Sequence, residues 1–358
     1  MALLAVETSC DDTSASVMDL SERLLSSVVG SQDEVHAPYG GIVPELASRQ
    51  HLTNLPAVVR AALRDAGISE RDLRRVAVTR GPGLLGSLLV GVSFAKALAW
   101  GLSLPLYGVN HVEAHLRSPW MEHPELPYPS LGLVVSGGHS HIFYCKALSH
   151  VQLVAATRDD AAGEALDKLG KRLGLPYPAG PVMDRLAPRG NPKAVPFSLP
   201  RMSSGSMDYS FSGLKTGALH YLNSRALSVP AGTPPDDLPQ WTYDLIASYQ
   251  KRIVDHLIQV LRRAALQLHP ASLTMAGGVA CNSLLRSRLL ERGDELGVPA
   301  AFPSTRFCTD NAAMVGFLAL SRRDEPVSPQ ADAFPTALWS RMSFCQWETG
   351  HAEHAHRK

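Results

Sequence analysis

The sequence predicts an α/β protein made of two similar halves, with a helix-rich insertion in the second half. Each half opens with a buried strand, a polar turn and a second strand, over residues 2–20 and again over 131–145. Each half later has a short strand, a glycine-rich turn and a helix, over 74–101 and 272–293. Because the same parts recur in the same order, an internal duplication explains both halves.

Within the first half, hydrophobic periodicity predicts each element in turn. The apolar run at the N-terminus breaks at the polar residues 9–14 and alternation then resumes, which indicates two strands joined by a turn. A helix is expected around 43–67, and the step from strand to helix recurs over 104–120. The prolines of "HPELPYPS" indicate a boundary, so the first domain is predicted to span 1–130.

The second half, predicted to span 131–310, carries the insertion. Residues of about 157–240 are rich in helix and loop signals, and an amphipathic helix follows over 241–268. Its apolar residues step at four, a spacing that buries one face of a helix. They are Leu245, Tyr249, Ile253, Leu257 and Leu261. A closing helix over 311–325 is expected to pack back on the first domain, and 326–358 is expected to be a C-terminal extension without a clear period.

The composition is that of a globular protein whose charges nearly balance. The formal net charge of +1 argues against a chain that coats nucleic acid by bulk charge, so any nucleic-acid site must be a local patch. The five cysteines form no C-x-x-C pair, which favours a reducing compartment over a disulfide framework. No signal peptide or long apolar run is evident, so we predict a cytoplasmic protein that does not enter a membrane.

The stretch "NHVEAHL" contains a candidate metal site. On a helix, His111 and His115 lie about 40° apart on one face and can share a metal. Glu113 falls about 200° from His111, whereas a zinc protease needs the glutamate beside the first histidine, as in H-E-x-x-H. The less favoured alternative is a pair of partly exposed histidines at the start of a helix with no ligand, and a third ligand would strengthen the metal interpretation.

Asp310 in "FCTDNAAMVG" is the best candidate for a third ligand. It stands at the start of a helical pattern, from which its carboxylate could reach inward to a metal. The alternative is that Thr309 or Asp310 caps the helix and complements its dipole. Taken alone, the residues favour the helix cap.

Two polar turns between strands form the other candidate region. In "VSGGHSH", the backbone N–H groups freed by Gly137 and Gly138 could cradle a phosphate, although such a turn is more often only a hairpin. Its counterpart in the first half, "ETSCDDTS", crowds Asp11 and Asp12 into a matching turn. Two polar hairpins that face each other across a cleft are typical of the actin, hexokinase and Hsp70 superfamily, an analogy at the level of the fold.

Basic side chains concentrate in the predicted insertion. They are Lys168, Lys171, Arg172, Arg185, Arg189, Lys193, Arg201 and Lys215. Such a group could contact a phosphate backbone, and a solvated surface explains it equally well.

Ten motifs follow one another over about residues 3–320: "VETSCDDTS", "GGIVPELASRQH", "TRGPGLLGSLLVG", "NHVEAHL", "VSGGHSH", "DDAAGEALDKLGK", "YPAGP", "DYSFSGLKT", "AGGVACNSLLR" and "CTDNAAMVG". Together they closely resemble the universal tRNA N6-adenosine threonylcarbamoyltransferase family, bacterial type. The resemblance implies an actin-like duplicated α/β fold with two lobes around a central cleft. It also implies transfer of the threonylcarbamoyl group of threonylcarbamoyl-AMP to N6 of adenosine 37 in tRNAs that read codons beginning with A, with release of AMP.

The resemblance also assigns roles to residues. His111, His115 and Asp310 would bind one divalent metal. The resemblance implies iron(II), and zinc is the alternative because two imidazoles and a carboxylate suit either metal. Asp11 and Asp12 would line the reaction centre, although the family usually has glutamate in place of Asp12. The substrate adenylate and its threonyl part would be held by Val135, Ser136, Gly137, Gly138, His139, Asp167, Gly180, Asp184 and Asn282.

The resemblance further implies partners. The partners would be tRNA, threonylcarbamoyl-AMP, an inactive paralogous subunit and a small P-loop ATPase. Three other functions are alternatives to the transferase activity. A small-molecule kinase of the same superfamily would not explain two histidines on one helix face, because magnesium prefers oxygen ligands. A metalloprotease is disfavoured by the position of Glu113, and a non-catalytic nucleotide-binding scaffold remains open.

Overall fold

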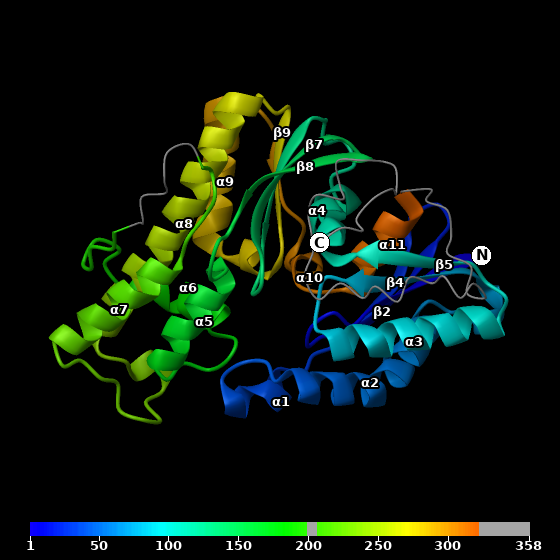
Figure 1. Cartoon of the computed structure of the whole chain (residues 1–358), viewed down its shortest axis with the longest axis horizontal. Helices are drawn as coiled ribbons and strands as arrows, with labels where there is room; N and C mark the ends of the chain where they lie inside the picture. Colours follow the sequence, from blue (N-terminus) through cyan, green and yellow to red (C-terminus); the bar gives the residue numbers. More distant parts are fainter. Residues whose placement is uncertain (199–205, 322–358) are drawn as a thin grey trace, which may run out of the picture.

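The computed structural model describes residues 1–198 and 206–321, which form two five-stranded sheets of the same topology (Figure 1). The first sheet has the order β3-β2-β1-β4-β5 and the second has β8-β7-β6-β9-β10. In each, the first three strands run antiparallel and the remaining two continue in parallel. The predicted duplicated α/β fold is therefore confirmed.

Seven strands match the predicted apolar runs, whereas the sequence did not indicate the third strand of either sheet or the short last strand of the second sheet. In the first sheet they are β1 (Ala2–Glu7), β2 (Thr13–Asp19), β3 (Leu24–Gly30), β4 (Leu73–Gly81) and β5 (Leu106–Asn110). In the second sheet they are β6 (Ser130–Val135), β7 (Ser140–Ala147), β8 (His150–Ala156), β9 (Ser272–Ala276) and β10 (Ala300–Ala301). The central strands β1 and β6 are buried along their whole length, as expected for strands covered on both faces.

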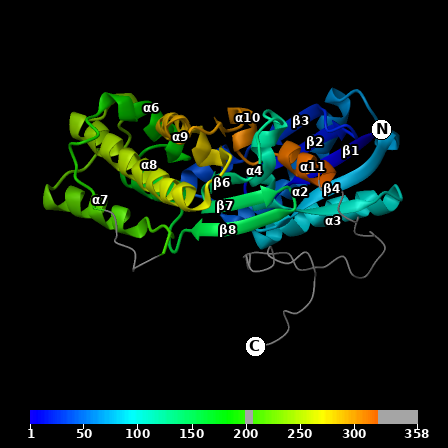
Figure 2. The same ribbon diagram turned by 90° about the horizontal axis from the view of Figure 1, so that it is seen from above.

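The helices of the first half are α1 (Asp33–His36), α2 (Pro44–Asp65), α3 (Leu85–Gly101) and α4 (His111–Arg117). Those of the second half are α5 (Ala162–Arg172), α6 (Ala179–Leu186), α7 (Ser212–Ser224), α8 (Gln240–Leu268), α9 (Ser283–Leu296), α10 (Thr305–Cys308) and α11 (Ala312–Ser321). The five apolar residues predicted to line one face of α8 are all buried in the core of the second half. Seen from above, α7 and α8 gather at one end of the molecule and α11 lies towards the other (Figure 2).

The two halves exchange one helix each. Helix α4 follows the last strand of the first sheet but packs against β6 and β9 of the second, where Leu116 fills the space that Gly132 leaves open. Helix α11 follows the second sheet but packs against β1 and β2, and Gly316 allows its close approach to Met18 and Ala5. Each half therefore closes the core of the other, and α4 and α11 meet between the two sheets.

The described residues contain no helix long and apolar enough to cross a membrane. The C-terminal extension predicted over 326–358, with the last residues of the closing helix, lies outside the described part of the chain.

Candidate metal centre and the cleft around it

Helix α4 presents two buried histidines on one face. Asn110 caps the helix, because its Oδ1 accepts a hydrogen bond from the backbone N–H of Glu113 at 3.0 Å. His111 is then the first helical residue and His115 follows one turn later, with ring centroids 4.7 Å apart. Their exposed fractions are 4% and 1%. The interpretation as two partly exposed histidines is therefore wrong.

Asp310 brings a carboxylate from the second half to these two rings. Its Oδ1 lies 2.9 Å from Nε2 of His115 and 3.5 Å from Nε2 of His111. One ligand atom from each of the three residues lies within 4.8 Å of the other two. Helix α11 is capped by Asn311, whose Oδ1 accepts the backbone N–H of Met314, so the cap predicted at Thr309 or Asp310 is wrong. The carboxylate of Asp310 points to the histidines.

The charges around this group favour a cation. Burial acts to lower the pKa of His111, but Asp310 and Glu7 outweigh it and raise that pKa to about 9. Burial likewise acts to raise the pKa of Asp310, but His111 and the hydrogen bond with His115 hold it well below its usual range. The group therefore keeps a positive charge between two carboxylates at neutral pH. Two imidazole nitrogens and one carboxylate oxygen suit a single divalent metal and leave positions open for a substrate.

Glu113 takes no part in this group. Although the residue is buried, its negative charge acts on the thiol of Cys145 in β7, on the side of α4 that faces the second sheet. A zinc protease would need this carboxylate beside the metal. The structure therefore agrees with the helical spacing, which places Glu113 away from the two histidines.

The turn between β1 and β2 carries two carboxyl groups towards the same region. Burial, together with the charges of Asp310 and Asp11, raises the pKa of Asp12 to about 8. Burial and Asp310 also raise the pKa of Asp11. The turn is held in place from behind, because Nε2 of His51 lies 3.0 Å from the Cys10 carbonyl. These carboxyl groups therefore lie close enough to the metal ligands to feel their charge.

The glycine loop before α3 supports this turn by close contact. The backbone N–H of Leu84 donates to the Ser9 carbonyl at 2.7 Å. A Cβ placed on Gly83 would lie 2.5 Å from the same oxygen, and one on Gly91, inside α3, would lie 2.1 Å from Oγ1 of Thr8. Only glycine leaves room for the turn at these two positions.

The matching turn between β6 and β7 reaches the metal ligands from the second half. Its backbone is closed by a hydrogen bond from the Ser136 N–H to the His139 carbonyl at 2.8 Å. The His139 and His111 rings lie 6.3 Å apart. Burial, with the charges of His141 and His111, lowers the pKa of His139 to about 3, so its imidazole is neutral. Gly137 and Gly138 border open space, where an added Cβ would touch nothing within 4 Å.

The other residues assigned to substrate binding belong to two hydrogen-bonded groups at the ends of α6. At its start, Oδ1 of Asp167 accepts the backbone N–H of Ala179 at 2.8 Å, and Gly180 is beside it. One turn further along, Oδ1 of Asp184 accepts from Nδ2 of Asn282 at 2.9 Å. The structure thus pairs Asp184 with Asn282, while Asp167 faces the first half, where the charge of Asp11 acts on it.

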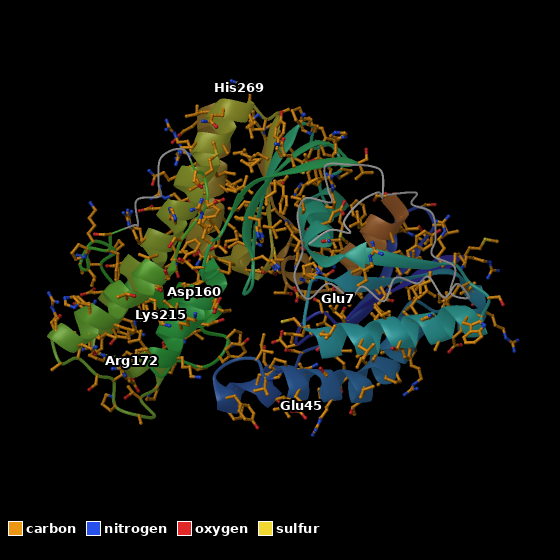
Figure 3. The ribbon with its side chains drawn as sticks, viewed as in Figure 1. Glu7, Glu45, Asp160, Arg172, Lys215 and His269 are labelled. Atoms are coloured by element: carbon orange, nitrogen blue, oxygen red, sulfur yellow. The ribbon has the colours of Figure 1, made fainter. Side chains whose placement is uncertain are left out.

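Two parts of this region were not anticipated from the sequence. Glu7 is completely buried, and its Oε2 lies 3.1 Å from Nδ1 of His111. The other is Tyr177, whose pKa is raised by burial and by the charges of Asp11 and Asp167. An acidic residue that ends an otherwise apolar strand was the available signal for Glu7, whereas Tyr177 gave none. Figure 3 shows Glu7 near the middle of the molecule.

Three of the eight basic residues of the insertion form ion pairs in the described part of the chain. Lys168 contacts Asp160 and Glu164, and Arg185 and Arg189 both contact Asp236. Figure 3 shows Arg172 and Lys215 in the half that lies away from Glu7. Arg201 lies outside the described residues. The paired residues carry less free positive charge than the sequence indicated.

Solved structures share this fold. HypF of T. kodakarensis superimposes with a TM-score of 0.60 and 14% identity, over 89% of this chain and 48% of HypF. Component A of (R)-2-hydroxyglutaryl-CoA dehydratase from Acidaminococcus fermentans gives a TM-score of 0.52 with 14% identity, over 90% of this chain and 98% of that protein. The two matching sheets and the exchanged helices define an actin-like protein with a candidate metal centre contributed by both halves.

Sequence comparison identifies the family. The family model described as tRNA N6-adenosine threonylcarbamoyltransferase matches residues 23–317. The protein of that name from Syntrophotalea carbinolica is 47% identical over 316 residues, which cover 88% of this chain and 90% of that protein. The one from Moorella thermoacetica is 43% identical over 318 residues, with coverage of 88% and 90%. This chain belongs to the tRNA N6-adenosine threonylcarbamoyltransferase family, and the family predicted from its motifs is confirmed.

Proposed function

We propose that this chain transfers the threonylcarbamoyl group of threonylcarbamoyl-AMP to N6 of adenosine 37 in tRNAs that read codons beginning with A. Family membership supports the reaction. The observation that points to particular residues is the convergence of His111 and His115, which are buried, with Asp310, which is partly exposed. A kinase of the same fold would not need this ligand set, because magnesium prefers oxygen ligands.

In this proposal, His111, His115 and Asp310 hold one divalent metal. The bound metal would supply Lewis-acid stabilisation of the negative charge that develops as N6 attacks the carbamoyl carbonyl. Iron(II) is our choice and zinc the alternative, since both accept two imidazoles and a carboxylate. His139, whose imidazole is neutral, lies beside the ligands without adding a charge that would repel a cation.

Asp11 and Asp12 would act at the reacting atoms. Attack on the carbonyl requires that N6 lose a proton, and a carboxylate whose pKa has been raised towards the working pH accepts a proton more readily than an ordinary one. The pKa of Asp12 is raised to about 8. We therefore assign Asp12 the role of general base and assign Asp11 to positioning of the acceptor amine. AMP leaves with the electrons of the broken bond.

The residues of the second half would hold the adenylate. The turn Val135–His139, with Ser136, Gly137 and Gly138, offers backbone N–H groups beside open space, which suits the phosphate. Asp167, Gly180, Asp184 and Asn282 would hold the nucleoside and threonyl parts. The pairing of Asp184 with Asn282 and Ser283 keeps this side preorganised. In this arrangement the first half supplies the carboxyl groups that act on the amine, the second half binds the adenylate, and both halves supply metal ligands.

The proposed partners are an inactive paralogous subunit and a small P-loop ATPase, in addition to tRNA in the cytoplasm. A row of exposed apolar side chains on the first half supports a protein partner. Leu85, Leu89 and Trp100 are 57%, 55% and 62% exposed, and they fall within about 60° of one another around α3. Leu52 on the adjacent α2 is 64% exposed. Figure 1 shows α2 and α3 side by side along one edge of the first half.

The decisive experiment is nucleoside analysis of an unmodified tRNA that reads codons beginning with A. The tRNA is incubated with this protein, its partner subunits and threonylcarbamoyl-AMP, with and without a chelator. We expect a peak of threonylcarbamoyladenosine that the chelator removes and that added iron(II) or zinc restores.

Two other results would correct the proposal. If active partners are present and no peak forms, the chain is a scaffold or a kinase, and ATP turnover with small-molecule acceptors distinguishes these. If the peak forms equally well with the chelator, the His111, His115 and Asp310 group has a structural role only.

A further inference from the structure

One buried carboxylate lies behind the candidate metal centre without belonging to it. Glu7 ends β1 and is completely buried. Its Oε2 lies 3.1 Å from Nδ1 of His111, the ring nitrogen opposite to the one that faces Asp310. The remaining oxygen, Oε1, accepts the backbone N–H of Ser9 at 2.5 Å.

The hydrogen bonds around Glu7 decide which partner carries the proton. Oε2 also accepts the hydroxyl of Thr79 at 2.5 Å, so both carboxylate oxygens already receive a donor. A carboxylate in this setting has only acceptor capacity left. Nδ1 of His111 therefore donates its N–H to Glu7, with the Ser9 hydroxyl 3.1 Å from the same nitrogen. Nε2, the nitrogen that faces Asp310, is then the one that gives up its proton when a metal binds.

The second histidine provides an internal comparison. Nδ1 of His115 is buried and has no hydrogen-bond partner among the described residues. Its ring orientation depends on packing and on the contact of Nε2 with Asp310. Only His111 is held through its far nitrogen, by a carboxylate that β1 and β4 fix from two sides.

We propose that Glu7 is a positioning residue, which holds the Nδ1–H of His111 so that its Nε2 is presented to the metal. A carboxylate that accepts the far N–H of a metal-binding histidine fixes both the tautomer and the ring orientation, and it makes the ligating nitrogen more basic. The inference rests on the proposed metal role of His111, His115 and Asp310. It extends that role to a residue that touches neither metal nor substrate.

Zinc affinity of the full-length protein tests this role, measured by competition with a chelating dye. Glu7→Gln keeps the size of the side chain but removes its charge, and we expect zinc to bind about 10–100-fold more weakly. Thr8→Val is the matched control. It removes a neighbouring buried hydrogen bond, from Oγ1 of Thr8 to the Ser87 carbonyl, without touching His111, and zinc affinity should stay within about twofold of wild type.

A spectroscopic readout separates positioning from a general loss of stability. In zinc-loaded protein labelled at its histidines, the Nδ1–H of His111 should give a downfield signal that exchanges slowly with water. The signal is assigned by its loss in His111→Gln. In Glu7→Gln it should move upfield or vanish, while Thr8→Val should retain it.

The outcomes are distinct. A folded Glu7→Gln variant with zinc affinity within twofold of wild type and an unchanged Nδ1–H signal overturns the inference. If Glu7→Gln does not fold, Thr79→Val decides: it removes one of the two fixing donors and should weaken zinc binding about three- to tenfold, and unchanged affinity overturns the inference. If Asp310→Ala loses zinc and Glu7→Gln does not, the positioning role of Glu7 is wrong and the proposed metal role of His111, His115 and Asp310 stands. If the wild-type protein binds no zinc, the positioning role and the metal role are both wrong.

Discussion

The two halves of the chain share one topology but carry different chemistry at the same place. The turn between β1 and β2 brings Asp11 and Asp12 near the candidate metal ligands, whereas the turn between β6 and β7 brings Gly137, Gly138 and His139 there. The first set can hold or accept protons, and the second can contact an anion through its backbone. Duplication has therefore preserved the positions of the two turns while their side chains have diverged.

What the halves do share is the support behind each turn. Gly83 packs against the Ser9 carbonyl in the first half, and Gly277 packs against the Val135 carbonyl in the second. In both, a glycine that follows a parallel strand lets the backbone approach the turn. The contacts between glycine and backbone are therefore common to both halves. The halves differ in the side chains of the two turns, which are carboxyl groups in the first half and glycines with a histidine in the second.

The candidate metal ligands also come from both halves. Helix α4 contributes two histidines from the first half, while the loop before α11 contributes Asp310 from the second. Because α4 and α11 are the exchanged helices, the site exists only when both halves are assembled. Ligands from the two halves should therefore be equally necessary.

The largest expected effect follows from removing one ligand from either half. We expect His111→Ala and Asp310→Ala each to reduce transfer at least about a thousand-fold, because a bound metal contributes several kcal/mol to the stabilisation of developing charge. The measurement is threonylcarbamoyladenosine formation together with bound metal per chain. His123→Ala changes a partly exposed histidine outside the site and serves as the control. Full activity of His111→Ala in metal-free buffer would contradict the metal role.

The next effect concerns the carboxyl groups that only the first turn carries. We expect Asp12→Asn to lower the transfer rate about 100-fold, as for loss of a general base. In the wild type, the rate should rise with pH until Asp12 is ionised, because only the carboxylate accepts a proton. A bound cation offsets the charge of Asp310, so the inflection should fall at or below pH 8. A pH profile that Asp12→Asn leaves unchanged in shape would assign the proton to another group.

Stability measurements test the close contacts between glycine and backbone that occur behind the turn in each half. Gly277→Ala places a Cβ 2.3 Å from the Val135 carbonyl oxygen at a φ of +94°, and we expect a loss of about 2–4 kcal/mol in the free energy of unfolding. Gly83→Ala, with a contact of 2.5 Å, should cost about 1–3 kcal/mol. Gly138→Ala meets open space and should change stability by less than about 0.5 kcal/mol in urea unfolding. Equal values for all three would show that the close contacts do not matter.

The smallest expected effect concerns the pH dependence of stability at two buried histidines, His256 in the second half and His51 in the first. His256 packs edge-on to Tyr209 and Phe211, and burial lowers its pKa to about 4. The unfolded chain then binds more protons than the native chain between pH 6.5 and about 4, so stability falls as the pH decreases through this range. We expect His256→Phe to recover about 2 kcal/mol at pH 5 and little at pH 8, measured by urea unfolding.

His51 of the first half provides the contrast, because its ring makes hydrogen bonds to Thr13 and the Cys10 carbonyl. His51→Phe should therefore destabilise the protein at both pH values, since it leaves these partners unpaired. If His256→Phe also behaves in this way, the imidazole of His256 has a polar partner that its ring contacts do not reveal.

The sequence by itself determined the duplication, most of the elements and the candidate ligands. Apolar runs and glycine turns are local, so β1, β2, β6, β7 and the helices that follow the glycines could be read from periodicity. The spacing of His111 and His115 placed both on one face and Glu113 on another, because helical geometry depends only on neighbours in the chain. The edge strands β3 and β8 escaped notice, since their alternation is weak and only pairing with β2 and β7 defines them.

Only the tertiary structure decided how these parts combine. Nothing in the local pattern distinguishes Asp310 as a ligand from Asp310 as a helix cap, since the choice depends on a histidine 195 positions away. The role of Glu7 depends in the same way on His111 and Thr79, which belong to other strands and helices. The basic residues of the insertion looked available in sequence, yet Asp236 and Asp160 neutralise several of them. Burial and charge at a site are sums over residues that folding brings together, and a linear pattern does not contain those sums.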